Sequence, residues 1–289
     1  LWNYHGDAAY KIEFIRDQGI TTLFGPPSDW LPMIDLCQRQ GTQLPDCLQH
    51  ILLGSAPVHA AFLEKLIAVL PGHCRISCLY GMTENLLVCS VDGRQKIRYN
   101  GPGDLLGQPV ENVELKIADD GEILLRSDQL FCRYLHLDEW PAWHATGDLG
   151  YLDDNRALVL TGRKKQMIIR RHQNIYPGLY EPTINKIPAV QQAVMIGCYS
   201  ETLHDEQVFL VVEASDNISE AALRKQLEYG PHSIDREALP DHIIFRRLPR
   251  KGRQQKVDRQ LLQLEVSKKF DLKKRSADQL SNTPKTLVR

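Results

Sequence analysis

The sequence predicts an α/β protein made of two unequal lobes, a larger N-terminal lobe and a smaller α+β lobe after it. Over about the first 80 residues, strand-like runs alternate with helix-like runs, which is typical of a mostly parallel sheet. The charge also changes sign near residue 162: residues 1–161 carry 12 Lys and Arg against 21 Asp and Glu, and residues 162–289 carry 23 against 15. This asymmetry indicates either two lobes with an anionic ligand near the basic one, or a chance difference between two solvated surfaces.

The elements of the larger lobe follow from hydrophobic periodicity and from glycine and proline stops. Helices are expected where apolar residues recur every three or four positions, and strands where short β-rich runs end at Gly or Pro. In chain order these are a helix over 7–18, a strand over 20–24, a helix over 30–40, a strand over 48–53, a helix opened by Pro57, and a strand over 75–79.

Short strands separated by Asp and Gly turns, such as 122–126, predict a small β subdomain between residues 110 and 160. Beyond Gly162 the expected elements are a strand over 167–170, a helix after Pro177, strands over 193–197 and 208–213, and a helix over 219–229 with Asn217 and Glu220 in capping-box spacing. Residues 268–289 carry seven basic and two acidic residues, which predicts a disordered tail. The predicted domains are therefore 1–163, 164–267 and the tail 268–289.

Composition excludes several classes of protein. With 43% hydrophobic and 25% charged residues the chain is not wholly disordered, and no apolar run reaches the roughly 18 residues of a membrane span. Seven cysteines without CxxC spacing favour reduced thiols in a cytoplasmic protein over a disulfide framework or a zinc site. The basic tail lacks interleaved aromatic residues, so no nucleic-acid partner is expected.

Four short clusters carry residues suited to nucleotide chemistry. The turn Gly54-Ser55-Ala56-Pro57 leaves a predicted strand and would let a flat ring approach the backbone, although a plain strand–helix turn has the same composition. Tyr80 to Glu84 offer an aromatic face, a hydroxyl and a carboxylate, and Mg²⁺ usually takes one or two protein carboxylates. Thr146-Gly147-Asp148 presents a carboxylate for ribose hydroxyls, or is an ordinary Asp turn. Gly162 to Lys165 lie where the charge changes sign.

In this order, the four clusters resemble the motifs of the adenylate-forming superfamily, which comprises acyl- and aryl-CoA ligases, adenylation domains of peptide synthetases and luciferase-like enzymes. Further matching segments are 143–151, 174–177 and 248–250, and Lys256-Val257-Asp258-Arg259, which is similar to the family's catalytic-lysine motif. The resemblance covers about residues 5–265. It implies that the chain holds the C-terminal part of the large AMP-binding lobe, with the small β subdomain, and a mobile α+β lobe.

The resemblance also implies roles for individual residues. The turn of Gly54, Ser55, Ala56 and Pro57, together with Tyr80 and Gly81, would hold adenine. Thr83 would contact the α-phosphate and Glu84 would ligate Mg²⁺. Asp148, assisted by Arg163, would bind the ribose, and Lys165 sits at the family's hinge position. Lys256 would bridge the acyl carboxylate and the α-phosphate.

The implied activity is ATP-dependent activation of a carboxylic acid to an acyl-adenylate, with release of pyrophosphate, followed by transfer to a thiol that is CoA by default. Apolar residues over 24–30 and 79–82 favour a fatty or aryl acid over an amino acid. Two alternatives stay open. One is a ligase that loads a carrier protein, and the other is a truncated paralogue that binds nucleotide or a partner without catalysis.

Three departures from the family pattern bear on these expectations. The Ser/Thr/Gly-rich phosphate loop is absent and the first residue is Leu, so the chain is expected to be incomplete. Arg171 and His172 stand where many CoA ligases have glycines, which favours a carrier-protein acceptor as the alternative to CoA. Gln255 stands where a glycine often precedes the catalytic lysine, and the loop before it is one residue longer, which makes Lys251 and the tail lysines lesser candidates for that role.

Overall fold

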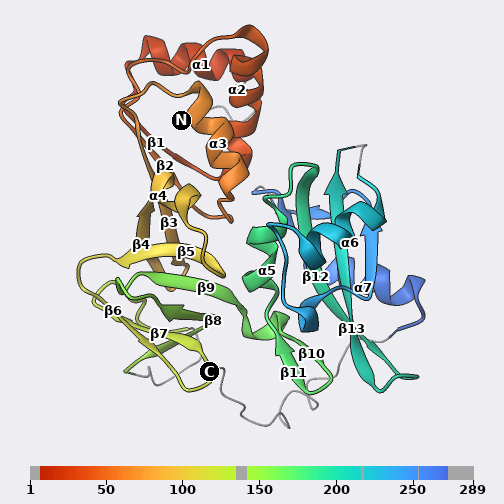
Figure 1. Cartoon of the computed structure of the whole chain (residues 1–289). Helices are drawn as coiled ribbons and strands as arrows, with labels where there is room; N and C mark the ends of the chain where they lie inside the picture. The colour runs from red at the N-terminus through yellow and green to blue at the C-terminus, as the bar shows by residue number, and fades with distance from the viewer. Residues whose placement is uncertain (1–6, 135–141, 216–217, 253, 273–289) are drawn as a thin grey trace.

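The computed structural model describes residues 7–134, 142–215, 218–252 and 254–272. Figure 1 shows two masses joined by one connection: residues 7–163, here called the N-terminal part, and residues 168–272, here called the C-terminal part. None of the helices in the described ranges combines the length and the apolar character that a membrane-spanning helix needs.

The N-terminal part is organised around one nine-stranded sheet with the order β1-β2-β3-β4-β5-β9-β8-β7-β6. Only its first three strands are parallel, namely β1 (Thr22–Gly25), β2 (His50–Leu53) and β3 (Arg75–Met82). The helices that connect and cover them are α1 (Ala8–Asp17), α2 (Pro27–Gln40) and α3 (Ala60–Val69). Apolar side chains of these helices, including Ile15, Ile34 and Leu66, are fully buried against β2 and β3.

The parallel pairing predicted from the first 80 residues is confirmed for β1, β2 and β3, and the other pairings in this sheet are antiparallel. After β3 the chain turns back directly into β4 (Asn85–Asp92), and a hairpin forces antiparallel pairing. The remaining elements are α4 (Gly93–Arg98), β5 (Asp104–Pro109), β6 (Val113–Ile117), β7 (Glu122–Ser127), β8 (His144–Leu152) and β9 (Leu158–Arg163). The predicted β subdomain has its own core, with Ile123, Leu125 and Leu158 fully buried, but its strands continue the large sheet through the β5–β9 pairing.

The C-terminal part is a three-stranded sheet with the order β12-β13-β14 and helices on both faces. Its main elements are α5 (Pro177–Ile184), β12 (Val190–Ser200), β13 (Asp205–Ala214), α6 (Glu220–Tyr229), β14 (His242–Phe245) and α7 (Arg259–Lys269). Helices α5 and α6 bury Ile184 and Leu223 on one face, and α7 buries Leu262 on the other. Two short hairpins complete the part, β10 (Ile168–Arg170) with β11 (Gln173–Ile175), and β15 (Arg250–Lys251) with β16 (Lys256–Val257).

Several predicted boundaries differ from the structure. Helix α3 begins at Ala60 rather than at Pro57, because residues 54–59 form an extended turn first. The N-cap of α6 is Ser219, whose side chain accepts a hydrogen bond from the Ala222 N–H, and Asn217 of the predicted capping box lies outside the described residues. The tail does not start at residue 268, because α7 runs to Lys269 and Phe270 and Leu272 pack on the core behind it. Residues 273–289 lie outside the described residues.

The two parts touch along α5. The Cα of Gly178 lies so close to β9 that an added Cβ would be 2.5 Å from the Thr161 carbonyl oxygen. The Gly103 N–H donates to the Leu179 carbonyl at 3.4 Å, and Lys186 donates to the Tyr99 carbonyl at 3.0 Å. These contacts fix the arrangement that brings residues of both parts to one site.

Candidate nucleotide site

Asp148 is the centre of a cluster formed by three strands. It lies on β8 directly opposite Arg163, the last residue of β9, and their side chains form an ion pair with 2.8 Å between Arg163 Nε and Asp148 Oδ1. The Tyr80 hydroxyl, from β3, donates a 2.7 Å hydrogen bond to the other oxygen, Asp148 Oδ2. The structure therefore brings together three residues from three of the four clusters singled out in the sequence.

Burial has the largest effect on the pKa of the Asp148 carboxyl group. The Asp148 side chain is only 5% exposed, whereas that of Arg163 is 65% exposed. Burial raises the pKa of Asp148, and the Arg163 charge and the Tyr80 hydrogen bond only partly oppose that rise. Burial and the Asp148 charge also raise the pKa of Tyr80, so its hydroxyl stays a donor. The cluster thus holds an acceptor whose ionised form is poorly solvated, and two ribose hydroxyls would solvate it.

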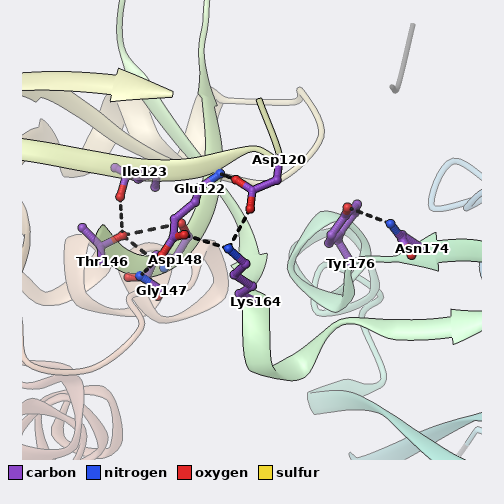
Figure 2. Close-up of polar contacts among 9 residues, drawn as sticks. All are labelled: Asp120, Glu122, Ile123, Thr146, Gly147, Asp148, Lys164, Asn174 and Tyr176. Carbon is purple, nitrogen blue, oxygen red and sulfur yellow. Dashed lines mark hydrogen bonds and ion pairs between the residues drawn. The ribbon is translucent and has the colours of Figure 1, made fainter. Parts of the chain in front are cut away.

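The backbone before Asp148 is shaped by a polar network (Figure 2). Thr146 Oγ1 donates to the Ile123 carbonyl at 2.8 Å and accepts the Asp148 N–H at 3.1 Å. Gly147 has a φ of +73°, which a side chain would strain, and its N–H donates to Glu122 Oε1 at 2.9 Å. The Thr-Gly-Asp segment is therefore a glycine-dependent irregularity inside β8 rather than a turn between strands.

Lys256, the predicted catalytic lysine, comes to the same region from the C-terminal part. It is the first residue of β16, and the β15–β16 hairpin pairs it with Lys251. Burial lowers the pKa of Lys256 and the neighbouring positive charge of Arg163 lowers it further. Lys251 instead donates to Asp258 at 3.2 Å and is half exposed. The charge of Arg163 contributes to the lowered pKa of Lys256, which indicates that this lysine lies near Arg163.

The turn of Gly54, Ser55, Ala56 and Pro57 follows β2, next to the strand that carries Tyr80. A Cβ on Gly54 would lie 3.2 Å from the Phe24 ring and 3.6 Å from Leu79, so glycine allows the turn to approach both strands. Ser55 has a φ of +64°, which marks a tight backbone reversal. Gly81 is required locally, because a Cβ there would lie 2.0 Å from the Leu86 carbonyl oxygen.

Thr83 and Glu84 form the two-residue turn between β3 and β4. The Glu84 carboxylate accepts a short hydrogen bond from the Tyr134 hydroxyl, which lowers the pKa of Glu84. In the described ranges, no group of three or more His, Cys, Asp or Glu could form a protein-only metal site. A lone carboxylate still fits Mg²⁺ that is held mainly by phosphate oxygens and water.

The connection between the two parts carries the remaining predicted residue. Lys165 is exposed within a short 3-10 turn over Lys164–Gln166, directly before β10. At the tip of the β10–β11 hairpin, Arg171 and His172 have φ values of +50° and +63° and are exposed. A non-glycine residue with left-handed backbone angles costs about 1–2 kcal/mol of conformational energy, and here two such residues follow each other. The glycine positions noted in the sequence are therefore occupied by Arg171 and His172 at a cost in backbone conformational energy.

A cavity of about 650 Å³ in the C-terminal part is lined by residues such as Val212, Phe245 and Arg247 and includes none of the predicted site residues. Sequence reasoning missed Glu122 and Tyr134. Glu122 follows an Asp-Asp-Gly turn that looks like ordinary solvent-exposed sequence, and only the fold brings its carboxylate to Gly147. Tyr134 has no local signal either, because its partner Glu84 is 50 residues away.

Comparison with known proteins supports the resemblance. The family described as "AMP-binding enzyme" matches residues 4–135. The chain is 32% identical over 264 residues to 2-succinylbenzoate–CoA ligase of Listeria monocytogenes, covering 85% of this chain and 54% of that protein. It is 29% identical over 216 residues to the fatty acid–[acyl-carrier-protein] ligase ScoC of Streptomyces coeruleorubidus, covering 67% and 40%.

In fold, the chain is similar to ATP-bound MatB from Rhodopseudomonas palustris, with a TM-score of 0.75, 22% identity, and coverage of 92% of this chain and 54% of that one. The chain spans about half the length of the curated relatives it matches. Motifs, family match and fold agree, and the chain belongs to the adenylate-forming superfamily of AMP-binding enzymes.

Proposed function

We propose that the chain is the nucleotide-binding portion of an ATP-dependent acid–thiol ligase, which activates a carboxylic acid as an acyl-adenylate and releases pyrophosphate. The observation that carries this proposal is the convergence of Tyr80 and Arg163 on the buried Asp148. The charge of Arg163 also lowers the pKa of Lys256, which supports a place for this lysine near the same residues. Asp148 accepts the ribose hydroxyls, and the ring of Tyr80 with the turn after Gly54 forms the adenine surface.

The chemistry requires a mobile positive charge. Attack of a carboxylate on the α-phosphorus brings two anions together, and charge develops as pyrophosphate leaves. Lys256 lies on a two-residue strand of a small hairpin. Its flexible side chain would place the ammonium between the acid and the α-phosphate. Thr83 donates to the phosphate, and Glu84 holds Mg²⁺, which supplies charge neutralisation when bound.

We further propose that the C-terminal part rotates as a lobe after adenylation, with the boundary at residues 163–164 and the pivot at Lys165. This would remove Lys256 and admit the acceptor thiol. CoA is the default acceptor. The exposed basic residues Arg171 and His172 favour a phosphorylated acceptor, and a carrier protein that bears phosphopantetheine is the second candidate. All seven cysteines are free thiols, which supports a cytoplasmic location.

The nature of the acid follows from the residues beside the adenine turn. Phe24 is 59% exposed next to Gly54, and the side chains there are apolar. A fatty or aryl acid fits this surface better than an α-amino acid, whose ammonium would need a carboxylate partner.

The experiment is a competition assay with hydrolysis-resistant acyl-sulfamoyl adenosines that carry a fatty, an aryl or an α-amino acyl group. The fatty or aryl compound is expected to displace a fluorescent AMP analogue at lower concentration than the amino compound. Preference for the amino compound would contradict the acid class, and failure of all three to compete would contradict the nucleotide site.

Acid-dependent ATP–pyrophosphate exchange, measured in parallel, separates a ligase from a non-catalytic paralogue, which would bind without exchange. Where exchange occurs, Lys256→Ala is expected to lower its rate by at least ~10²-fold, the order expected for losing one key electrostatic group. Near-unchanged exchange would remove Lys256 from the mechanism. Comparing free CoA with a holo carrier protein then identifies the acceptor.

A further inference from the structure

Lys164, the residue after Arg163, is held between two acidic side chains at the beginning of β7 (Figure 2). Its Nζ donates to Asp120 Oδ2 at 2.6 Å and to Glu122 Oε2 at 2.8 Å. Both carboxylates raise the pKa of Lys164, so the lysine stays charged. Glu122 is only 14% exposed, whereas Lys164 is 49% exposed.

Glu122 uses its two oxygens for two different purposes. Oε2 accepts from Lys164, and Oε1 accepts the N–H of Gly147, the residue before Asp148. The contacts therefore close a ring: Arg163 binds Asp148, the next residue Lys164 binds Glu122, and Glu122 binds Gly147, which is joined to Asp148 by a peptide bond. Each contact in such a ring restrains the geometry of the others.

The chain becomes part of the C-terminal core immediately afterwards. Ile168 is 1% exposed in that core, and the Ile169 N–H donates to Glu206 Oε2 at 2.5 Å. Lys165 and Gln166 are exposed, and within the described part of the chain neither side chain makes a hydrogen bond or an ion pair. Both ends of the connection are thus fixed, and residues 165–167 are what remains free to turn.

We propose that Lys164 is a positioning residue, which clamps the start of the connection to β7 and, through Glu122, holds the Gly147–Asp148 segment in the geometry that receives the ribose. Rotation of the C-terminal part is then confined to residues 165–167, and Arg163 stays on Asp148 throughout. As a half-exposed ion pair the clamp adds little to global stability. Its effect is local order at the site. The expected effect on AMP affinity rests on the proposed nucleotide function. The existence of the clamp does not depend on that function.

The test compares Lys164→Met with Lys225→Met, which removes an exposed lysine on α6, and with Lys164→Arg, which keeps the charge. Amide hydrogen exchange is followed by mass spectrometry, and AMP affinity by calorimetry. In Lys164→Met, the amides of residues 145–150 and 163–166 are expected to exchange about tenfold faster, and AMP to bind about fivefold more weakly, with an unchanged melting temperature. Lys164→Arg restores both values, and Lys225→Met changes neither.

Unchanged exchange in Lys164→Met would overturn the proposal. So would faster exchange throughout the chain together with a lower melting temperature, because Lys164 would then be a general stability element. If the parent chain does not bind AMP, the proposed nucleotide function fails, whereas the exchange data still decide whether the clamp exists.

Discussion

Tyr80 and Asp148 lie on strands that are four positions apart in the sheet, yet the Tyr80 hydroxyl donates a 2.7 Å hydrogen bond to the Asp148 carboxylate. In a flat sheet those strands would be roughly 19 Å apart at the usual strand spacing. The sheet must therefore curve strongly between β3 and β8, and this curvature creates the site. Irregular pairings at β3–β4, β5–β9 and β8–β9 allow the bend.

The first prediction separates the contribution of the Tyr80 ring to AMP binding from that of the Tyr80 hydroxyl. Tyr80→Phe keeps the aromatic surface and is expected to weaken AMP binding only about threefold, because one hydrogen bond to Asp148 is lost. Tyr80→Ala removes the ring as well and is expected to weaken binding by ~10-fold or more, the order of one base–aromatic contact. Calorimetric titration of both variants with AMP measures the difference. Equal losses in the two variants would show that the ring does not contact the base.

The second prediction concerns pH. Burial raises the pKa of Asp148, so on acidification this carboxylate is protonated earlier than an ordinary aspartate. Protonation removes the ribose acceptor, so AMP affinity should fall as pH falls, with a midpoint above the usual aspartate range. The effect on stability has the opposite sign. The pKa of Asp148 is higher in the folded than in the unfolded state, because burial penalises the charged form. As pH falls from the folded to the unfolded pKa, the contribution of this group to the free energy of unfolding therefore rises.

Affinity titrations between pH 4 and 8, with Asp148→Asn as the non-titrating control, check the assignment. An affinity profile that is flat over this range, or that is the same in the control, would mean that another group governs binding.

The third prediction uses the close contact between the two parts. Gly178→Ala would place a Cβ 2.5 Å from the Thr161 carbonyl oxygen, and that backbone atom cannot move away easily. The two parts should separate while each keeps its own core, since Gly178 belongs to neither. Small-angle X-ray scattering should show a larger radius of gyration with an unchanged circular dichroism spectrum. Gly72→Ala is a matched control, because no atom lies within 4 Å of its added Cβ. An unchanged radius in Gly178→Ala would contradict this account of the interface.

The fourth prediction tests the location of Lys256. Its lowered pKa leaves more neutral amine than an ordinary lysine has. When a reactive acyl-AMP is added, the Lys256 nitrogen should attack the acyl carbon, form an amide, and release AMP and a proton. Peptide mapping by mass spectrometry should find Lys256 acylated several-fold more than Lys251, which is paired with Asp258. Equal labelling of the two lysines would place Lys256 away from the adenylate.

Short motifs that keep their order along the chain single out Asp148, Arg163 and Tyr80, and the structure shows the three side chains in contact. Their roles in nucleotide binding stay predictions. The hairpin that follows Tyr80 was missed, because Thr83 and Glu84 were interpreted as a ligand loop rather than as the turn into β4. Glu122 and Lys164 could not be paired in advance, since their contact depends on the register of β7, β8 and β9 and not on any local pattern.

The fifth prediction tests most directly the central claim that Asp148 binds the ribose of the nucleotide. The chain and its variant Asp148→Asn are titrated with AMP in a calorimeter, and Asp154→Asn, a variant of an exposed residue, serves as control. The chain and the control should bind AMP at a single site. Asp148→Asn should lose at least ~10-fold in affinity, because a charged acceptor is removed, without any loss of melting temperature, because a buried charge is removed with it. Binding of AMP by Asp148→Asn with the affinity of the parent chain, or no saturable binding by the folded parent, would contradict the account.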